Sequence, residues 1–407
     1  MASIKPKRRK DGTEVWEVRW YPHPGSNQKS KSFYDPDDAE EFVRELRRAH
    51  SKGEPAPEPH RRRRAVTLGD WYLEHRERAR WEQNTQKNYR SVFRAHVAHP
   101  SYGIADEPLP TLSDERIARF RDDMDSAGVP ANAQSKTLTL VSSLLSAAAE
   151  RRSHTGVRQN PMLRGGVKKP RAKRVRPVLV FAPVAFEAVR FELLHAPGRG
   201  ERERARDALW QSCTSLAGLR PEEAWALQPD FFRERTIAVV QAVAHGEVKR
   251  TKEDEWHYPP LHPVLREELD AYLERWPVEF GQLIFDDPAL PGKPIADHNW
   301  RNWRKRVWRG ARDRALAHVP ARERAKLLAA RPYDLGRHSY ASLRLRAGMS
   351  NNLAGLVAEL GHTTISQLSA TYAHEIAEYR GAEPVDWVAE VRSARARLAR
   401  RTLRSAA

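Results

Sequence analysis

The sequence predicts a multidomain α+β protein. We expect a small N-terminal module of β-sheet and one helix, an all-α domain, and a mixed, mainly α domain with a small antiparallel sheet. A chain of 407 residues is long enough for two or three domains, each with its own core. Apolar and polar side chains alternate with period two over 14–20, whereas 135–151 has leucines at helical spacing. Two basic stretches, GEPAPEPHRRRR and KKPRAKRVR, separate the three parts.

Residues 1–55 are predicted to form the first unit. Glu14 to Trp20 is typical of a half-buried strand, and Lys29 to Tyr34 reads as the next strand. Asp35 is a suitable N-cap for a helix that begins at Pro36 and continues to Ala49. A sheet of two or three strands with one helix is a small unit, and this one is rich in Lys and Arg.

The stretch 56–65 is predicted to be a basic linker, because prolines precede four consecutive arginines. Residues 66–162 then read as entirely helical. Four helices are predicted. The first begins at Leu68, and the other three cover Thr85 to His96, Asp114 to Met124, and Ser135 to Arg151. The leucine stripe of the last helix indicates a core rather than a site.

A second basic linker is predicted at 163–177, followed by a domain at 178–385 and a basic tail at 386–407. Thr236 to Val243 alternates and is β-branched, so it predicts a strand that turns at 245–247 and returns over Val248 to Leu261. Further on, a helical face carries apolar residues that we assign to the core, namely Trp300, Trp303 and Val307.

The composition indicates a polyanionic partner, for which nucleic acid is the commonest. The net charge is +18, with 71 Lys plus Arg against 53 Asp plus Glu. The only cysteine, Cys213, excludes an intramolecular disulfide and a cysteine-based zinc cluster. The sequence has neither a long apolar run nor the apolar core of a signal peptide, so we expect no membrane association and a cytoplasmic location at the nucleoid.

One stretch, 331–374, concentrates residues suited to phosphate chemistry. It opens with Arg337 and His338, and an apolar run at i, i+3, i+4 and i+7 follows over 353–360. Gly361 stands where that helix would need a left-handed C-terminal residue, and His362 comes directly after it. Tyr372 follows ten residues later, in a polar segment.

These motifs resemble the tyrosine recombinase (phage integrase) family. The resemblance is carried by Arg337-His338, Leu360-Gly361-His362 and Thr371-Tyr372-Ala373-His374, and upstream by Gly218-Leu219-Arg220 and Lys252. It covers roughly 175 to 385 and implies the tyrosine recombinase fold, with 178–385 as the catalytic domain and 66–162 as a helical, SAM-like core-binding domain. Residues 1–55 resemble the arm-type DNA-binding domain of many phage integrases. Possible DNA contacts in the helical domain are Lys87, Arg90 and Lys136.

The resemblance implies a role for each matched residue. Tyr372 would be the nucleophile that becomes joined to the 3′ phosphate, and arginine would supply permanently charged, bidentate donors to that phosphate through Arg220 and Arg337. Lys252, or Lys249 as the fallback, would protonate the leaving 5′ oxygen, and His362 would donate a hydrogen bond to the phosphate. No cofactor and no metal is expected.

The sequence departs from the family at one position. The family commonly has a histidine three residues before its second arginine, as proton acceptor for the tyrosine. Here that position holds Asp334, with Tyr333 before it and an apparent extra residue, Gly336. We expect the role to pass to Asp334 or His338, or to be weakened.

The expected function is site-specific strand exchange on double-stranded DNA, for integration or excision of a phage or other mobile element. The expected partners are further copies of the chain, as a homotetramer on synapsed sites, and an accessory DNA-bending or directionality factor. A catalytically weakened DNA-binding protein on the same fold is the first alternative, because the proton-acceptor position is altered. A topoisomerase-like nicking enzyme is the second, and it would need no defined site.

Overall fold

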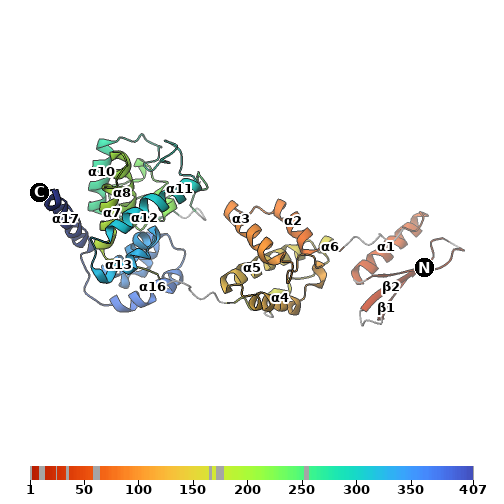
Figure 1. Cartoon of the computed structure of the whole chain (residues 1–407). Helices are drawn as coiled ribbons and strands as arrows, with labels where there is room; N and C mark the ends of the chain where they lie inside the picture. Colours follow the sequence, from red (N-terminus) through yellow and green to blue (C-terminus); the bar gives the residue numbers. More distant parts are fainter. Residues whose placement is uncertain are drawn as a thin grey trace. The chain divides into compact units, whose positions relative to one another are not determined.

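The computed structural model describes residues 2–8, 14–23, 25–33, 36–57, 65–164, 167–170, 178–251 and 256–406. The chain divides into two compact units, Met1–Val175 and Arg176–Ala407 (Figure 1). Across these described ranges, no helix has the length and apolar character needed to cross a membrane.

The N-terminal module is a three-stranded antiparallel sheet with one helix packed on it. The strands are β1 (Ser3–Arg8), β2 (Glu14–Trp20) and β3 (Lys29–Phe33), in the order β1-β2-β3, and the helix is α1 (Pro36–Lys52). Trp20 meets Phe42 of α1 edge to face, with 5.0 Å between ring centroids. Alternation in β2 and the amphipathic pattern of α1 were visible in the sequence, but the predicted N-cap Asp35 lies outside the described residues.

The next part of this unit is helical and has its own apolar core. Its elements are α2 (Leu68–Arg78), α3 (Gln83–Val92), η1 (Phe93–Val97), η2 (Leu109–Thr111), α4 (Asp114–Ser126), α5 (Ala131–Glu150), α6 (Arg152–Thr155) and η3 (Pro161–Arg164). The indole of Trp71 donates a hydrogen bond of 2.9 Å to the carbonyl of Leu144, which joins α2 to α5 in the core. Thr67 begins α2 by accepting a hydrogen bond from the backbone N–H of Asp70.

The C-terminal unit is mainly helical around a single apolar core. It begins with α7 (Pro183–Leu194), α8 (Glu201–Leu216), α9 (Pro221–Ala224), η4 (Pro229–Phe231), β4 (Gln241–Ala244), β5 (Glu247–Arg250) and α10 (Pro263–Arg275). It continues with α11 (Asp297–Trp303), η6 (Arg304–Trp308), α12 (Arg309–Ala315), α13 (Ala321–Leu328), η7 (Asp334–His338), α14 (Ser339–Arg346), η8 (Met349–Asn351), α15 (Leu353–Leu360), α16 (Ile365–Tyr379) and α17 (Trp387–Ala406). Trp303 packs 5.0 Å from Trp210 of α8, so the predicted tryptophan stripe belongs to the core.

The β4-β5 hairpin is the small antiparallel sheet expected in this unit. Its turn consists of His245 and Gly246, both with positive φ (59° and 76°), as a two-residue hairpin turn requires. The regular strand begins at Gln241 rather than at Thr236, and the preceding residues form only isolated bridges, Thr236 with Pro260 and Val239 with His257.

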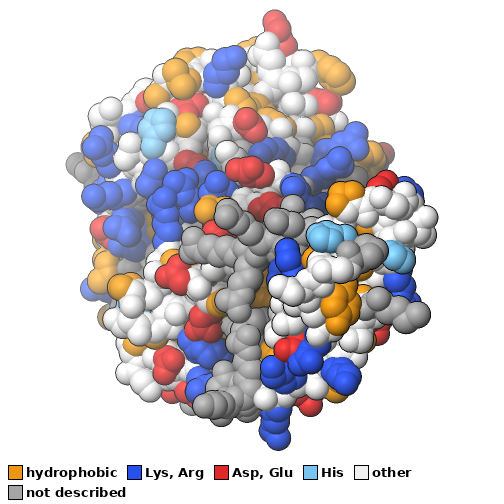
Figure 2. Space-filling view, turned by 90° about the vertical axis from the view of Figure 1, so that its right-hand side faces the viewer, with side chains coloured by type: hydrophobic (Ala, Val, Ile, Leu, Met, Phe, Trp, Pro, Cys, Tyr) orange, Lys and Arg blue, Asp and Glu red, His pale blue; other side chains and the backbone are white. Residues whose placement is uncertain are grey.

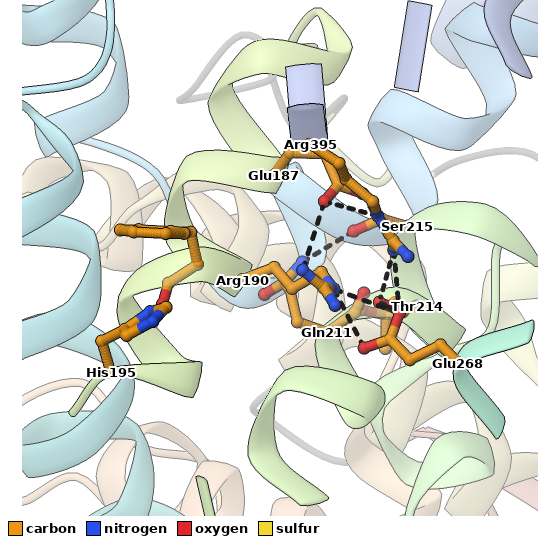
Figure 3. A network of polar contacts seen from close by, with 10 residues as sticks. Glu187, Arg190, His195, Gln211, Thr214, Ser215, Glu268 and Arg395 are labelled. Carbon is orange, nitrogen blue, oxygen red and sulfur yellow. Dashed lines mark hydrogen bonds and ion pairs between the residues drawn. The ribbon is translucent and has the colours of Figure 1, made fainter. Parts of the chain in front are cut away.

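The last helix, α17, is joined to the unit by a buried ionic network (Figure 3). Arg395 reaches Glu187 of α7, with 2.9 Å between Nε and Oε2, and Glu268 of α10, with 2.8 Å between Nη2 and Oε2. Arg190 also binds Glu268, at 2.9 Å. The predicted basic tail is therefore a helix packed on this unit, because the guanidinium of Arg395 pairs with two buried carboxylates of the same chain.

Candidate active site

Arg220 lies at the start of α9, directly after a tight bend. The bend depends on Gly218, whose φ is +67° and which has no room for a Cβ because the ring of Tyr340 occupies that space. The Arg220 side chain donates to Oε1 of Glu223 at 2.5 Å and to the carbonyl of Gly361 at 3.2 Å. The predicted Gly-Leu-Arg turn therefore projects this arginine toward the end of α15.

Glu223 is the buried anion that holds Arg220. Burial by itself would raise the pKa of this carboxyl, but His257 and the charges of Arg337 and Arg220 lower it far below its usual value. The Nε2 of His257 lies 3.5 Å from Oε1 of Glu223, and its Nδ1 lies 2.9 Å from the carbonyl oxygen of Glu359. The carboxylate stays ionised and keeps the guanidinium oriented.

Arg337 is almost completely buried, with 2% of its surface exposed. It donates to the carbonyl of Gly218 at 3.0 Å and to the carbonyl of Leu360, the last residue of α15. Burial lowers the pKa of Arg337. A guanidinium remains charged in proteins, so the carbonyls at the end of α15 hold a fixed positive charge here.

Arg337 and His338 belong to one turn of π-helix, η7, which contains an extra residue relative to an α-helical turn. Gly336 has φ −88° and ψ −109°, outside helical values. A Cβ on Gly336 would lie 2.8 Å from the Cβ of Thr214 on α8, so only glycine allows this close approach. The extra glycine seen in the sequence is thus absorbed as a local bulge, and α14 continues regularly from Ser339.

His362 follows the C-terminal cap of α15. Gly361 is left-handed, with φ +56°, and a Cβ there would lie 2.6 Å from the ring of His257. Burial, followed by the charges of Arg337 and Arg220, lowers the pKa of His362 to about 4. Its Nδ1 is buried without a hydrogen-bond partner. A neutral imidazole with an unpaired nitrogen beside two arginines is suited to contact an added oxyanion.

Tyr372 lies inside α16, and its hydroxyl oxygen is 2.6 Å from Nδ1 of His338. The tyrosine is 2% exposed, and its backbone (φ −122°, ψ 21°) departs from helical geometry. The polar segment that carries it forms a helix, Ile365 to Tyr379, which is interrupted at the tyrosine itself. The contact places an imidazole nitrogen within proton-transfer distance of the phenol oxygen.

The other predicted site residues have different surroundings. Asp334 is fully buried and accepts hydrogen bonds from the backbone and side chain of Arg331, at 2.9 and 3.1 Å. Lys249 is exposed on β5, 3.2 Å from Glu247, and Lys252 lies outside the described residues. The structure thus brings together Arg220, Arg337, His362, Tyr372 and His338.

Two supporting residues were missed in the sequence. His257 contacts Glu223 and lies against Gly361, and Glu359 ties α15 to α14 by accepting from Tyr340 at 2.9 Å and from Arg344 at 2.6 Å. Each of the two contacts residues on other elements of the fold, so no pattern in the neighbouring sequence could have identified it. Within the described part of the chain, no group of three or more His, Cys, Asp or Glu could hold a metal ion.

The site therefore offers two guanidiniums, a neutral imidazole and a phenol beside a second imidazole. No protein-family model and no curated protein matches the chain. Solved structures do match. The Tn1549 transposon integrase in complex with transposon right end DNA has a TM-score of 0.56 at 16% identity, covering 76% of this chain and 95% of that one. The XerH site-specific recombinase, bound to a palindromic difH substrate in a post-cleavage complex, has a TM-score of 0.52 at 15% identity, covering 86% and 88%. The chain has the tyrosine recombinase fold.

Proposed function

We propose that this protein is a site-specific DNA recombinase that cuts and rejoins DNA through a covalent 3′-phosphotyrosyl intermediate. The observation that carries the proposal is the 2.6 Å contact between the Tyr372 hydroxyl and His338, next to the buried Arg337. A phenol with an adjacent base is an activated nucleophile, and the neighbouring guanidiniums favour an attack on phosphorus.

In the proposed reaction, His338 accepts the phenol proton while the Tyr372 oxygen bonds to phosphorus. The bond from phosphorus to the 5′ oxygen breaks, and that oxygen takes a proton, which we assign to Lys252. The charge that develops on the non-bridging oxygens is stabilised by Arg220, Arg337 and the neutral His362. The reverse attack by a 5′ hydroxyl restores the phosphodiester and frees the tyrosine. The ester conserves the bond energy, so rejoining needs no ATP.

Of the two residues considered for proton acceptor, we assign the role to His338. Its Nδ1 contacts the hydroxyl of Tyr372 directly. The carboxylate of Asp334 instead accepts hydrogen bonds from the backbone N–H and the side chain of Arg331. The altered sequence at this position therefore leaves a base at the tyrosine. This favours a working enzyme over the weakened DNA-binding protein.

The charge distribution supports DNA as the substrate. Figure 2 shows Lys and Arg side chains in several groups on one face, with Asp and Glu side chains scattered between them, and the net charge of the chain is +18. In the N-terminal module, one face of the sheet is covered by α1, and the strand register places Lys5, Lys7 and Arg19 on the opposite face. We propose this face as the arm-type DNA contact, and the exposed Lys87, Arg90 and Lys136 as contacts of the helical domain. A homotetramer on synapsed sites and an accessory factor stay predictions.

A suicide substrate tests the proposal. DNA flanking the gene is nicked near the cleavage point, so that the short fragment bearing the new 5′ hydroxyl diffuses away and the covalent complex is trapped. Denaturing electrophoresis then compares the wild type, Tyr372→Phe, and the control Tyr379→Phe, which removes a hydroxyl from the same helix. We expect an adduct with the wild type and the control but not with Tyr372→Phe. Specific binding without any adduct would indicate a DNA-binding protein, and relaxation of plasmids without a defined site would indicate a nicking enzyme.

A further inference from the structure

A second phenol, Tyr333, lies at the edge of the candidate active site. Its ring meets the ring of His338 edge to face, with 4.7 Å between centroids. It lies within electrostatic range of both guanidiniums, because a negative charge on this phenol would raise the pKa of Arg220 and of Arg337. The side chain is half-buried, and its hydroxyl forms no hydrogen bond with any residue in the described ranges.

The π turn explains why Tyr333 points at this place. In a regular α-helix, the residue four positions on, Arg337, would lie over Tyr333. The extra residue in η7 shifts the register, so that Tyr333 packs on His338, five positions on. Gly336 makes this possible through its contact with Thr214. The π turn therefore places the side chain of Tyr333 beside His338, whereas a regular α-helix would place it beside Arg337.

The two phenols differ in what surrounds them. The hydroxyl of Tyr372 lies 2.6 Å from Nδ1 of His338, and the residue as a whole is 2% exposed. Tyr333 meets the same histidine with its ring rather than with its hydroxyl. A phenol hydroxyl near two guanidiniums can donate a hydrogen bond to an oxyanion.

We infer that Tyr333 is a catalytic residue of the cleavage reaction, whose hydroxyl donates a hydrogen bond to one non-bridging oxygen of the scissile phosphate beside Arg220 and Arg337. The inference rests on the proposed recombinase function. It goes beyond that function because it assigns a neutral donor to a position outside the five matched residues. The donor acts mainly in the transition state, where the charge on the oxygen is greatest.

The test measures the rate of adduct formation on the suicide substrate for Tyr333→Phe. Removal of one donor to a developing oxyanion costs about 10²-fold in rate, so we expect a loss of that order with little change in DNA affinity. Tyr379→Phe serves as the matched control and is expected to keep the wild-type rate. Tyr333→Leu separates the ring from the hydroxyl, because the phenylalanine variant keeps the packing on His338 and the leucine variant does not.

A chemical readout identifies the atom that is contacted. Scissile methylphosphonates replace one non-bridging oxygen with a methyl group, and the two diastereomers lack different oxygens. On the diastereomer that lacks the contacted oxygen, wild type and Tyr333→Phe should cleave at equal rates. On the other, the loss of about 10²-fold should persist. A Tyr333→Phe rate equal to wild type on the ordinary phosphate overturns the inference, and so does the same loss on all three substrates.

The two proposals fail in distinguishable ways. If the wild type forms no adduct on its specific DNA, the recombinase function itself is wrong. If the wild type forms the adduct and only Tyr333→Leu is slow, Tyr333 positions His338 through its ring, and the hydroxyl has no part in catalysis. In that case the recombinase proposal stands and the inference about Tyr333 is wrong.

Discussion

The Nδ1 of His338 and the hydroxyl of Tyr372 lie 2.6 Å apart, although 34 positions separate them in the sequence. We predict that His338→Ala slows adduct formation by about 10²- to 10⁴-fold, the usual contribution of a general base, while DNA affinity is kept. The control is His374→Ala. The side chain of that histidine is exposed, and its ion-pair contact is with the adjacent residue Glu375, at 3.7 Å. The measurement is the single-turnover rate on the suicide substrate. Equal rates for His338→Ala and wild type would assign the base elsewhere.

Gly336→Ala should destabilise the protein by about 1–3 kcal/mol, because its Cβ would enter the space of Thr214 in a packed core. The control is Gly310→Ala in α12, where the nearest atom is the far end of the Arg314 side chain at 3.4 Å. That helical glycine should tolerate alanine or gain stability of about 0.5–1 kcal/mol. Chemical denaturation measures both. A Gly336→Ala variant as stable as the wild type would mean that η7 relaxes at no cost.

Arg395→Met should destabilise the C-terminal unit by about 3–5 kcal/mol, because Arg190 alone is then left to balance the two buried carboxylates of Glu187 and Glu268. Arg392→Ala, on the same helix, removes an exposed pair with Glu267 and should change stability by at most about 1 kcal/mol. Denaturant titrations of both variants give the comparison. Similar small losses for the two would show that α17 does not depend on the buried network.

Stability should fall as the pH drops from about 6.5 to 4. Burial first, and then nearby arginine charges, lower the pKa of His262 and of His362 to about 4. The unfolded chain therefore binds more protons than the folded chain in this window, so the stabilisation that is present above pH 6.5 is lost as the pH falls. Replacing either histidine with glutamine should reduce the slope of the unfolding free energy against pH, by an amount that corresponds to at most about one bound proton. Unchanged pH curves for both variants would contradict the lowered pKa values.

The parts of the site that follow local rules were predictable from the sequence. The helix Leu353–Leu360 and the glycine that ends it have the predicted places, because periodicity and the left-handed cap act within a few residues. The tryptophans of α11 also lie in the core, as their spacing indicated. The tyrosine recombinase fold that the motifs implied is confirmed by the solved structures.

The remaining features depend on contacts between distant parts of the chain. His257 and Gly361 meet across more than a hundred positions, and Arg395 pairs with Glu187 at a separation of 208. The polar segment around Tyr372 forms a helix, in which Leu368 and Ile376 are buried although polar residues surround them in the sequence. The bulge at Gly336 could be suspected as an insertion, yet its geometry depends on Thr214 of another helix.

The order of the site residues along the chain has a consequence for synthesis. Arg220 emerges from the ribosome early, while the carbonyls of Leu360 and Gly361 that receive the two arginines come much later, and Tyr372 later still. The Met1–Val175 unit, with cores of its own, can fold before any of them is made. On the proposed function, a nascent chain can therefore fold the parts assigned to DNA contact long before it contains Tyr372, and we expect premature termination ahead of Tyr372 to release a fragment that binds DNA without cutting it.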